Sequence, residues 1–515
     1  MKVSLVDRRH RSTNVGIPDD ASRDAPPGRK STIVLLAAVA CAVLGAKLIT
    51  IAALGSAAPL VDQWDGEAAG LYSPYLRGSL SFADLLAPHN EHRILVFRVL
   101  ALAHLELAGE WNTRLEMIFG AIVHTAAITW LVALLLPLVA QQRQIILASF
   151  VAFLFALPIG YENELSGFQT QVYLSLLFGI AALVAFAFAR PFSARWFGGL
   201  AAAVLSYFSF ATGVAAVLGA GVLIGLQIAR GTRRRCGLEF AGVGLIAAIV
   251  LALIVWSAAS AKQMSTPLML IQGLLLVGGQ AIVGLVPMVW FCRSTLARRP
   301  AMSDRAWAAV GISVWLVLQL LLLAYGRGAT VAVRYMDVIL LVYPVGLMAT
   351  LALFERARGS RFSRYAGPSA VTWVFVVVSA VSVLGYVSAV GAIGWGESAR
   401  QQVVNIQTYF AKGNVAALKA KGGGGHMFDL SYPNSQRLAA ILADPGVRAI
   451  LPHEVRPPDH DNAAARSRML LKGAFASATA AAVHFILLIA PALLALGVGL
   501  LYALGARLSI SGAKR

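Results

Sequence analysis

The chain has 515 residues, of which 58% are hydrophobic and only 13% are charged. Soluble proteins carry about 25% charged residues, so this chain has too little polar surface to coat a globule, and a water-soluble enzyme is excluded. The formal net charge is +19. In a membrane protein, basic loops retained in the cytoplasm explain such an excess, so we expect no nucleic-acid partner.

Residues 1–31 are polar and basic and contain no apolar core of a signal peptide, which predicts a disordered cytoplasmic tail. Twelve apolar runs follow, and they predict an all-α polytopic membrane protein. Residues 32–394 form the predicted transmembrane bundle, and 470–515 hold the last transmembrane helix and a cytoplasmic tail. The runs are 32–56, 112–139, 145–160, 170–189, 196–211, 213–229, 237–258, 267–292, 306–325, 335–354, 370–394 and 471–506.

Basic residues recur in every second connection between these runs, as in the arginine-rich loop 230–235. The positive-inside rule therefore predicts that both termini are cytoplasmic and that the protein is a multi-pass protein of the inner membrane. On this topology two polar regions lie outside, a first loop at 57–111 and a small segment at 395–469. The apolar stretch 93–109 carries four ionisable residues, so an interfacial helix is favoured over a span.

The first polar cluster follows the first predicted helix and contains Asp62 and Asp65. Paired carboxylates can deprotonate an acceptor hydroxyl, or they can hold a divalent cation such as Mg²⁺ or Mn²⁺. We predict no other cofactor. The alternative is a solvated loop in which Asp65 caps a helix.

The second cluster is the run His89, Asn90, Glu91, His92 and Arg93. Histidines three residues apart with a glutamate between them do not match an established zinc spacing, so no metal site is predicted. Instead, Arg93 can bind a phosphate and Glu91 is a second candidate acid. The alternative is a set of interfacial residues that anchor a helix among lipid headgroups.

The third cluster lies at a predicted hairpin and contains Glu162, Glu164, Gln169 and Gln171. Carboxylates and amides are typical partners of sugar hydroxyls. A plain polar hairpin is the alternative, although Gln171 lies within an apolar run, where an amide needs a partner.

The fourth cluster comprises Arg327, Arg334 and Tyr335, in and beside an otherwise apolar outer loop. Two guanidinium groups at this boundary can clamp a phosphate or pyrophosphate. Alternatively, they extend to ordinary phospholipid headgroups. All four clusters fall on the predicted outer face, which favours a site at the mouth of a helical bundle.

This arrangement resembles the GT-C class of glycosyltransferases, which includes protein O-mannosyltransferases, the lipid A aminoarabinose transferase and the catalytic subunit of oligosaccharyltransferase. The shared features are an acidic motif after the first helix, many apolar helices and a polar segment before the last helix. The strings that carry the resemblance are Asp62-Gln63-Trp64-Asp65, Asn90-Glu91-His92-Arg93, Gly326-Arg327, Arg334-Tyr335 and Tyr432-Pro433. The chain lacks the adjacent Asp-Glu pair of the mannosyltransferases and the Trp-Trp-Asp motif of oligosaccharyltransferase.

The resemblance implies a sugar donor linked to polyprenyl phosphate, an extracytoplasmic reaction and a catalytic Asp at position 62, with Asp65 as its neighbour. The expected function is inverting transfer of the sugar to an envelope glycan, lipid or protein acceptor, with membrane lipids as further partners. Two alternatives stay open. One is a transporter or flippase of a lipid-linked glycan, and the other is an envelope glycan ligase or polymerase.

Overall fold

The computed structural model describes residues 29–258, 266–328, 330–419, 428–458 and 462–513, and this part of the chain is helical without a β-strand. The predicted class of an all-helical, multi-pass membrane protein is therefore confirmed. Most of the predicted N-terminal tail, residues 1–28, lies outside the described residues.

Ten helical segments in the described residues are long and apolar enough to cross a membrane. The helices that build them are α1 (Arg29–Leu54), α5 (Thr113–Leu135), α8 (Thr170–Phe188), α10 (Val214–Ala229), α11 (Gly237–Ala258), α12 (Pro267–Arg298), α13 (Ala306–Arg327), α14 (Met336–Leu340) with α15 (Val342–Ala357), α16 (Ser363–Lys412) and α21 (Ala490–Ala513).

Two of the twelve predicted runs form shorter helices, α6 (Gln144–Ala156) and α9 (Ala194–Tyr207), with 13 and 14 residues. At 1.5 Å per residue they are about 20 Å long, whereas the hydrocarbon core of a bilayer is about 30 Å thick. By length and composition, ten segments of the described residues are candidate spans, and the predicted count of twelve is not confirmed. The last predicted run divides into α20 (Ala476–Leu488) and α21.

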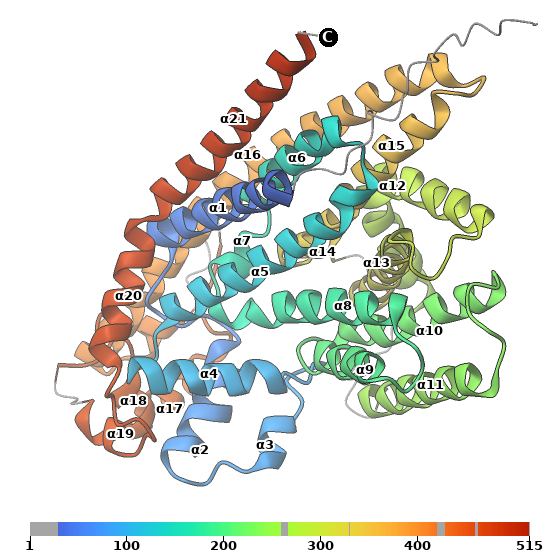
Figure 1. Ribbon diagram of the computed structural model, residues 1–515. Coiled ribbons are helices and arrows are strands. Elements are labelled where there is room, and N and C mark those ends of the chain that lie inside the picture. The colour runs from blue at the N-terminus through green and yellow to red at the C-terminus, as the bar shows by residue number, and fades with distance from the viewer. Residues whose placement is uncertain (1–28, 259–265, 329, 420–427, 459–461, 514–515) are drawn as a thin grey trace, which may run out of the picture.

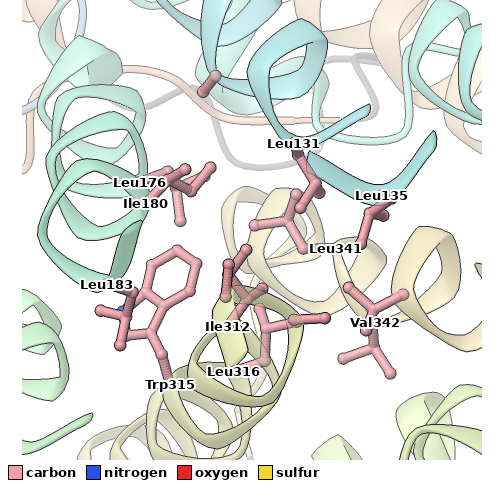
Figure 2. Packing of buried hydrophobic residues seen from close by; sticks show 14 of the residues in the cluster. Leu131, Leu135, Leu176, Ile180, Leu183, Ile312, Trp315, Leu316, Leu341 and Val342 are labelled. Atoms are coloured by element: carbon pink, nitrogen blue, oxygen red, sulfur yellow. The ribbon is translucent and has the colours of Figure 1, made fainter. Parts of the chain in front are cut away.

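The centre of the bundle is an apolar core shared by α5, α8, α13, α14 and α15 (Figure 2). Because lipid is as apolar as these side chains, close packing rather than removal from water holds such helices together. Because these helices pack closely, the loops that connect them are held at fixed positions relative to one another. The labelled core residues, each at most 1% exposed, are Leu131, Leu135, Leu176, Ile180, Leu183, Ile312, Trp315, Leu316, Leu341 and Val342.

The connection between α1 and α5 folds into four short elements at one end of the molecule (Figure 1). They are the π-helix η2 (Trp64–Tyr72), α2 (Ser73–Leu76), α3 (Phe82–Leu86) and α4 (Leu95–Ala108). α4 contains most of the ambiguous stretch 93–109 and is not among the ten candidate spans. Three helices from the C-terminal part gather at the same end: α17 (Ser435–Ala443), α18 (Pro445–Ile450) and α19 (Ala463–Ser467).

These two regions share a second hydrophobic core. Trp64, Phe97 and Trp111 from the first region pack in one cluster with Leu442 and Ile450 from the second, and all five are at most 2% exposed. The backbone N–H of Trp111 donates to the carbonyl of Ile450 at 2.7 Å. The predicted outer loop 57–111 and the described part of 395–469 therefore fold together.

α16 links this end of the molecule to the bundle. It is a single helix of 50 residues, or about 75 Å long at 1.5 Å per residue, and it continues well past residue 394, where the predicted bundle ends. Its C-terminal part brings Trp395 and Ala399 beside the loop 57–111, where they pack with Leu60.

Candidate functional site

A small cavity of about 60 Å³ lies where three of the predicted polar clusters meet. Asp62 comes from the turn before η2, Glu162 from α7 (Tyr161–Glu164), Gln169 from η5 (Gly167–Gln169) and Arg334 from η7 (Val333–Tyr335). The remaining walls are Leu60, Val61, Ser166, Phe168 and Trp395. Side chains far apart in the sequence are thus gathered around one cavity.

The Asp62 carboxylate is half-buried, and within the described residues it forms no hydrogen bond or ion pair. Its turn is strained, because Val61 has a φ of 41°, a left-handed conformation that is unfavourable for a β-branched residue. The Gln63 side chain holds the turn by accepting a hydrogen bond from the Leu60 N–H at 3.0 Å. Strain of this kind is concentrated at functional sites, and here it sets an acid with free lone pairs against the cavity.

Arg334 and Glu162 supply the opposite wall, with the Arg334 Nε lying 3.9 Å from the Glu162 Oε2. Burial raises the pKa of Glu162, and the nearby Arg334 opposes that shift. The guanidinium carbon of Arg334 also lies 5.8 Å from the centre of the Tyr335 ring. Because the contact with Glu162 is long, the guanidinium keeps hydrogen-bonding capacity for an anion in the cavity.

Arg327 belongs to a neighbouring cluster with Glu91 and His92. Its guanidinium forms an ion pair with Glu91 and lies 3.3 Å from the His92 Nε2. Burial lowers the pKa of His92 to about 3, so its ring is neutral at pH 7. The ring is also fixed by stacking on Phe210 at 4.2 Å between centroids and by accepting a hydrogen bond from the Ala211 N–H.

Tyr335 connects this cluster to the cavity, because Arg327 lies 5.3 Å from the centre of the same ring that Arg334 approaches. Arg327 already has an acidic partner, whereas Arg334 has only a distant one. Of the two arginines, Arg334 is therefore the better placed to meet a phosphate in the cavity.

The other residues of the second cluster form the turn that carries Glu91. The backbones of His89 and His92 exchange two hydrogen bonds at 2.8 and 2.9 Å, and Asn90 takes a left-handed φ of 51° at the tip. The His89 ring contacts Phe168 edge to face, 5.0 Å between centroids, and its Nε2 is buried without a hydrogen-bond partner in the described part of the chain.

Arg93 is buried beside this turn. It donates to the Leu86 carbonyl at 2.8 Å and lies 4.2 Å from the centre of the Trp256 ring. Arg98 likewise donates to three carbonyls at the end of α3, at 2.6 to 3.0 Å. In this conformation both arginines support the fold of the first loop, and neither lines the cavity.

Asp65 points away from the cavity toward the C-terminal region. Its carboxylate accepts hydrogen bonds from the Arg437 Nε at 2.7 Å and Nη2 at 2.5 Å, and also from the Tyr432 hydroxyl. Both partners belong to the region 395–469, so Asp65 joins the two regions that share the second core.

Two members of the third cluster also lie elsewhere. Glu164 forms a buried ion pair with Lys47 inside the bundle. Gln171, at the start of α8, is buried, and its amide oxygen has no hydrogen-bond partner among the described residues. The structure therefore separates these two residues from Glu162 and Gln169.

A buried acid pair beneath the Asp62 turn was not predicted. Gln63 donates to both Glu67 and Glu116, at 3.2 and 3.3 Å, and the Tyr72 hydroxyl lies 3.2 and 3.1 Å from the same two carboxylates. The Trp111 indole donates to Glu67 at 2.8 Å. Burial raises the pKa of Glu67 to about 7. The sequence signal was present, because Glu67 follows Asp65 by two residues and Glu116 is an acid at the start of an apolar helix.

Within the described residues, no group of three or more His, Cys, Asp and Glu side chains is arranged to hold a metal ion. Comparison of the chain with protein-family models, curated proteins and solved structures found no match.

Proposed function

We propose that this protein is an integral membrane glycosyltransferase of the GT-C type, which moves a sugar from a polyprenyl-phosphate-linked donor to a cell-envelope acceptor on the extracytoplasmic face. The observation that carries the proposal is the cavity in which Asp62, whose carboxylate forms no hydrogen bond or ion pair in the described residues, lies among Glu162, Gln169 and Arg334. A carboxylate base, polar groups for hydroxyls and a guanidinium for phosphate are what such a transfer requires.

In the proposed reaction, Asp62 accepts the proton of the acceptor hydroxyl as its oxygen attacks the anomeric carbon of the donor sugar. The bond from that carbon to the phosphate oxygen breaks, and the phosphate leaves with the electron pair. Arg334 stabilises the departing charge. Attack from the face opposite the phosphate inverts the anomeric centre. The leaving phosphate is an anion already, so no general acid is needed.

The cavity must widen to admit a sugar, because 60 Å³ is far below the roughly 300–1,000 Å³ of common ligand pockets. Trp395 of α16 forms one wall and contacts Phe428 of the C-terminal region, at 5.9 Å between ring centroids. We expect this side of the cavity to move on substrate binding, with Trp395 presenting its ring to the sugar.

A larger recess of about 480 Å³ suits the lipid part of the donor. One wall is apolar and comes from α20, while the rim is polar and includes the ion pair between Arg114 and Glu454, 2.8 Å apart. The recess and the cavity adjoin the same stretch of chain, since Ala57 lines the first and Leu60 the second. An apolar wall below a polar rim is appropriate for a lipid phosphate.

The test is Asp62→Asn in purified protein supplied with a polyprenyl-phosphate-linked sugar. A general base contributes about 10²- to 10⁴-fold to rate, so we expect at least a 100-fold loss with unchanged folding. Asp65→Asn is the matched control, because that carboxylate is engaged by Arg437 outside the cavity. If Asp62→Asn stays as active as Asp65→Asn and the wild type, the transferase proposal fails.

A flippase for a lipid-linked glycan is the second candidate, favoured by the charged residues Lys47 and Asp337 at membrane depth. Mass spectrometry of surface glycans from a deletion strain separates the two. Loss of one sugar residue supports transfer, whereas accumulation of an intact precursor on the inner side supports transport.

A further inference from the structure

A cluster of charged side chains lies inside the bundle, beneath the cavity. Lys47 of α1, Glu164 of α7 and Asp337 of α14 are each at most 3% exposed. Lys47 forms an ion pair with Glu164. The Asp337 Oδ2 accepts hydrogen bonds from the Asn163 amide at 2.7 Å and from the Tyr173 hydroxyl at 3.0 Å.

Two of the three charged residues, Lys47 and Asp337, belong to candidate membrane spans, and Glu164 lies in the short helix α7 between two other spans. Lys47 is seven residues before the end of α1, or about 10 Å along the helix axis. Asp337 belongs to the span Val333–Ala357. Charged residues at this depth are rare, pair with one another and mark ion or substrate pathways, so the cluster calls for a functional explanation.

The charges in the cluster do not balance. Two carboxylates face one ammonium group, and no other basic side chain in the described residues forms an ion pair with Glu164 or Asp337. His124 of α5 stacks on Tyr173 at 4.1 Å between centroids, but neither of its ring nitrogens has a hydrogen-bond partner there. No neighbouring group therefore stabilises a protonated His124, and one negative charge of the carboxylates remains uncompensated.

The cluster also has acceptor atoms without donors. The Glu164 Oε2 and the Asn163 Oδ1 are buried and lack hydrogen-bond partners among the described residues. The other terminal atom of each side chain forms a hydrogen bond within the cluster: Glu164 Oε1 accepts from Lys47, and Asn163 Nδ2 donates to Asp337. A bound cation would both neutralise the surplus negative charge and occupy the unused oxygen acceptors.

We propose that Lys47, Glu164 and Asp337, with Asn163 and Tyr173, form a buried binding site for one monovalent cation, a proton or Na⁺. A proton neutralises one of the carboxylates and turns it into a hydrogen-bond donor. A sodium ion meets carboxylate, amide and phenol oxygens, which hard cations prefer. In either form the bound cation restores neutrality to a group of charges inside the membrane.

The site is mechanically linked to the cavity above it. The Asn163 amide that binds Asp337 also donates to the backbone carbonyl of Arg334 at 2.7 Å. A change in the charge on Asp337 therefore alters the contact that fixes the Arg334 segment. The cation site holds independently of whether the cavity transfers a sugar or admits one for transport.

Two measurements on the purified full-length protein test the site and distinguish the two cations. Equilibrium binding of radioactive Na⁺ at pH 8, against choline at equal ionic strength, is expected to give one ion per chain if the ligand is sodium. Infrared difference spectra between wild type and Asp337→Asn at pH 7 without Na⁺ are expected to show one protonated carboxylic acid if the ligand is a proton.

Asp337→Asn removes the surplus charge and leaves the Lys47–Glu164 pair intact, so we expect it to fold; Glu164→Gln is the second variant. Glu67→Gln, in the separate acid pair, is the control and should retain Na⁺ binding. Bound Na⁺ or a carboxylic acid band that is lost in Asp337→Asn or Glu164→Gln supports the site. Absence of Na⁺ binding, together with difference spectra for both variants that lack a carboxylic acid band, overturns it.

Discussion

At the scale of single residues, the cavity depends on the one turn that presents Asp62. The strained Val61 and the bond from Leu60 to Gln63 fix this turn, and Gln63 is held in place by the acid pair Glu67 and Glu116. The carboxylate proposed as base is thus positioned by buried groups that do not themselves line the cavity.

Arg334→Lys is expected to impair use of the donor although the charge is kept. A guanidinium meets a phosphate with two parallel hydrogen bonds, whereas an ammonium offers a point charge. Losing a charge-assisted contact costs about 1.5–3 kcal/mol, or about 10- to 150-fold in affinity. Titration of the polyprenyl-linked donor in nanodiscs measures the effect, with Arg334→Ala expected to be worse.

Arg327→Lys is the matched control for that experiment, because Arg327 is engaged by Glu91 and we expect a smaller change. Acceptor dependence should be unaffected in both variants. An unchanged dependence on donor in Arg334→Lys and Arg334→Ala would reduce Arg334 to a contact with lipid headgroups.

Stability is expected to fall as the pH rises through the titration of Glu67. Burial raises the pKa of this acid from 4.5 to about 7, so between these values the folded state binds more protons than the unfolded state. The contribution is therefore present at low pH and is lost toward pH 7, with a maximal slope of about 1.4 kcal/mol per pH unit. Thermal unfolding between pH 4.5 and pH 8 measures it.

Glu67→Gln is the control, since its amide cannot titrate and the fall over this window should become shallower. If wild type and Glu67→Gln show the same dependence of unfolding temperature on pH, the proton is not held at this pair.

At the scale of elements, the regions 57–111 and 395–469 are joined by polar contacts as well as by their shared core. Asp65 of η2 binds Arg437 of α17 and the nearby Tyr432. Ser73, the first residue of α2, donates to Asp444 between α17 and α18 at 2.5 Å. These contacts connect residues more than 360 positions apart, so no local sequence pattern could reveal them.

A double-mutant cycle on Asp65 and Arg437 is expected to give a measurable coupling energy. Exposed ion pairs contribute about 0–1 kcal/mol, but this carboxylate accepts two hydrogen bonds from one guanidinium, and bidentate pairs are stronger. We expect a coupling of about 1 kcal/mol in thermal unfolding. The pair Arg77 and Asp444, 3.7 Å apart, is the control and should give less; equal couplings for the two pairs would contradict the interpretation.

The sequence predicted that the polar clusters converge on one end of the bundle. It did not predict which of their residues line the cavity and which bind other partners. Asp62, Glu162, Gln169 and Arg334 share a cavity as the outer-face clustering implied. Residue spacing could not show that Asp65 turns to Arg437 or that Glu164 turns to Lys47, because these partners lie 372 and 117 positions away in the chain.

At the scale of the whole molecule, the polar elements gather at one end while the C-terminus lies at the opposite end (Figure 1). The helices α11, α12, α16 and α21 present large exposed apolar side chains, such as Leu275 and Phe375, which suits a surface in contact with lipid. The arrangement is compatible with a bundle whose site opens on a single side of the membrane. The distribution of basic residues then decides which side that is.

We predict that the end carrying η2 and α17 is extracytoplasmic and that both termini are cytoplasmic. The arginines of loop 230–235 and of the 356–364 connection lie in alternate connections between the helices, which favours the cytoplasmic side for these connections.

Single cysteines at Ser79 and Gln436, both exposed, should react in intact cells with a membrane-impermeant thiol reagent. The native Cys236, also exposed, is the inner probe and should react only after the membrane is permeabilised. Each probe is read with the other native cysteines replaced by serine. Protection of Ser79→Cys or Gln436→Cys in intact cells, or labelling of Cys236 there, would reverse the topology and place the Asp62 cavity on the cytoplasmic side, where a donor flipped to the outer leaflet could not reach it.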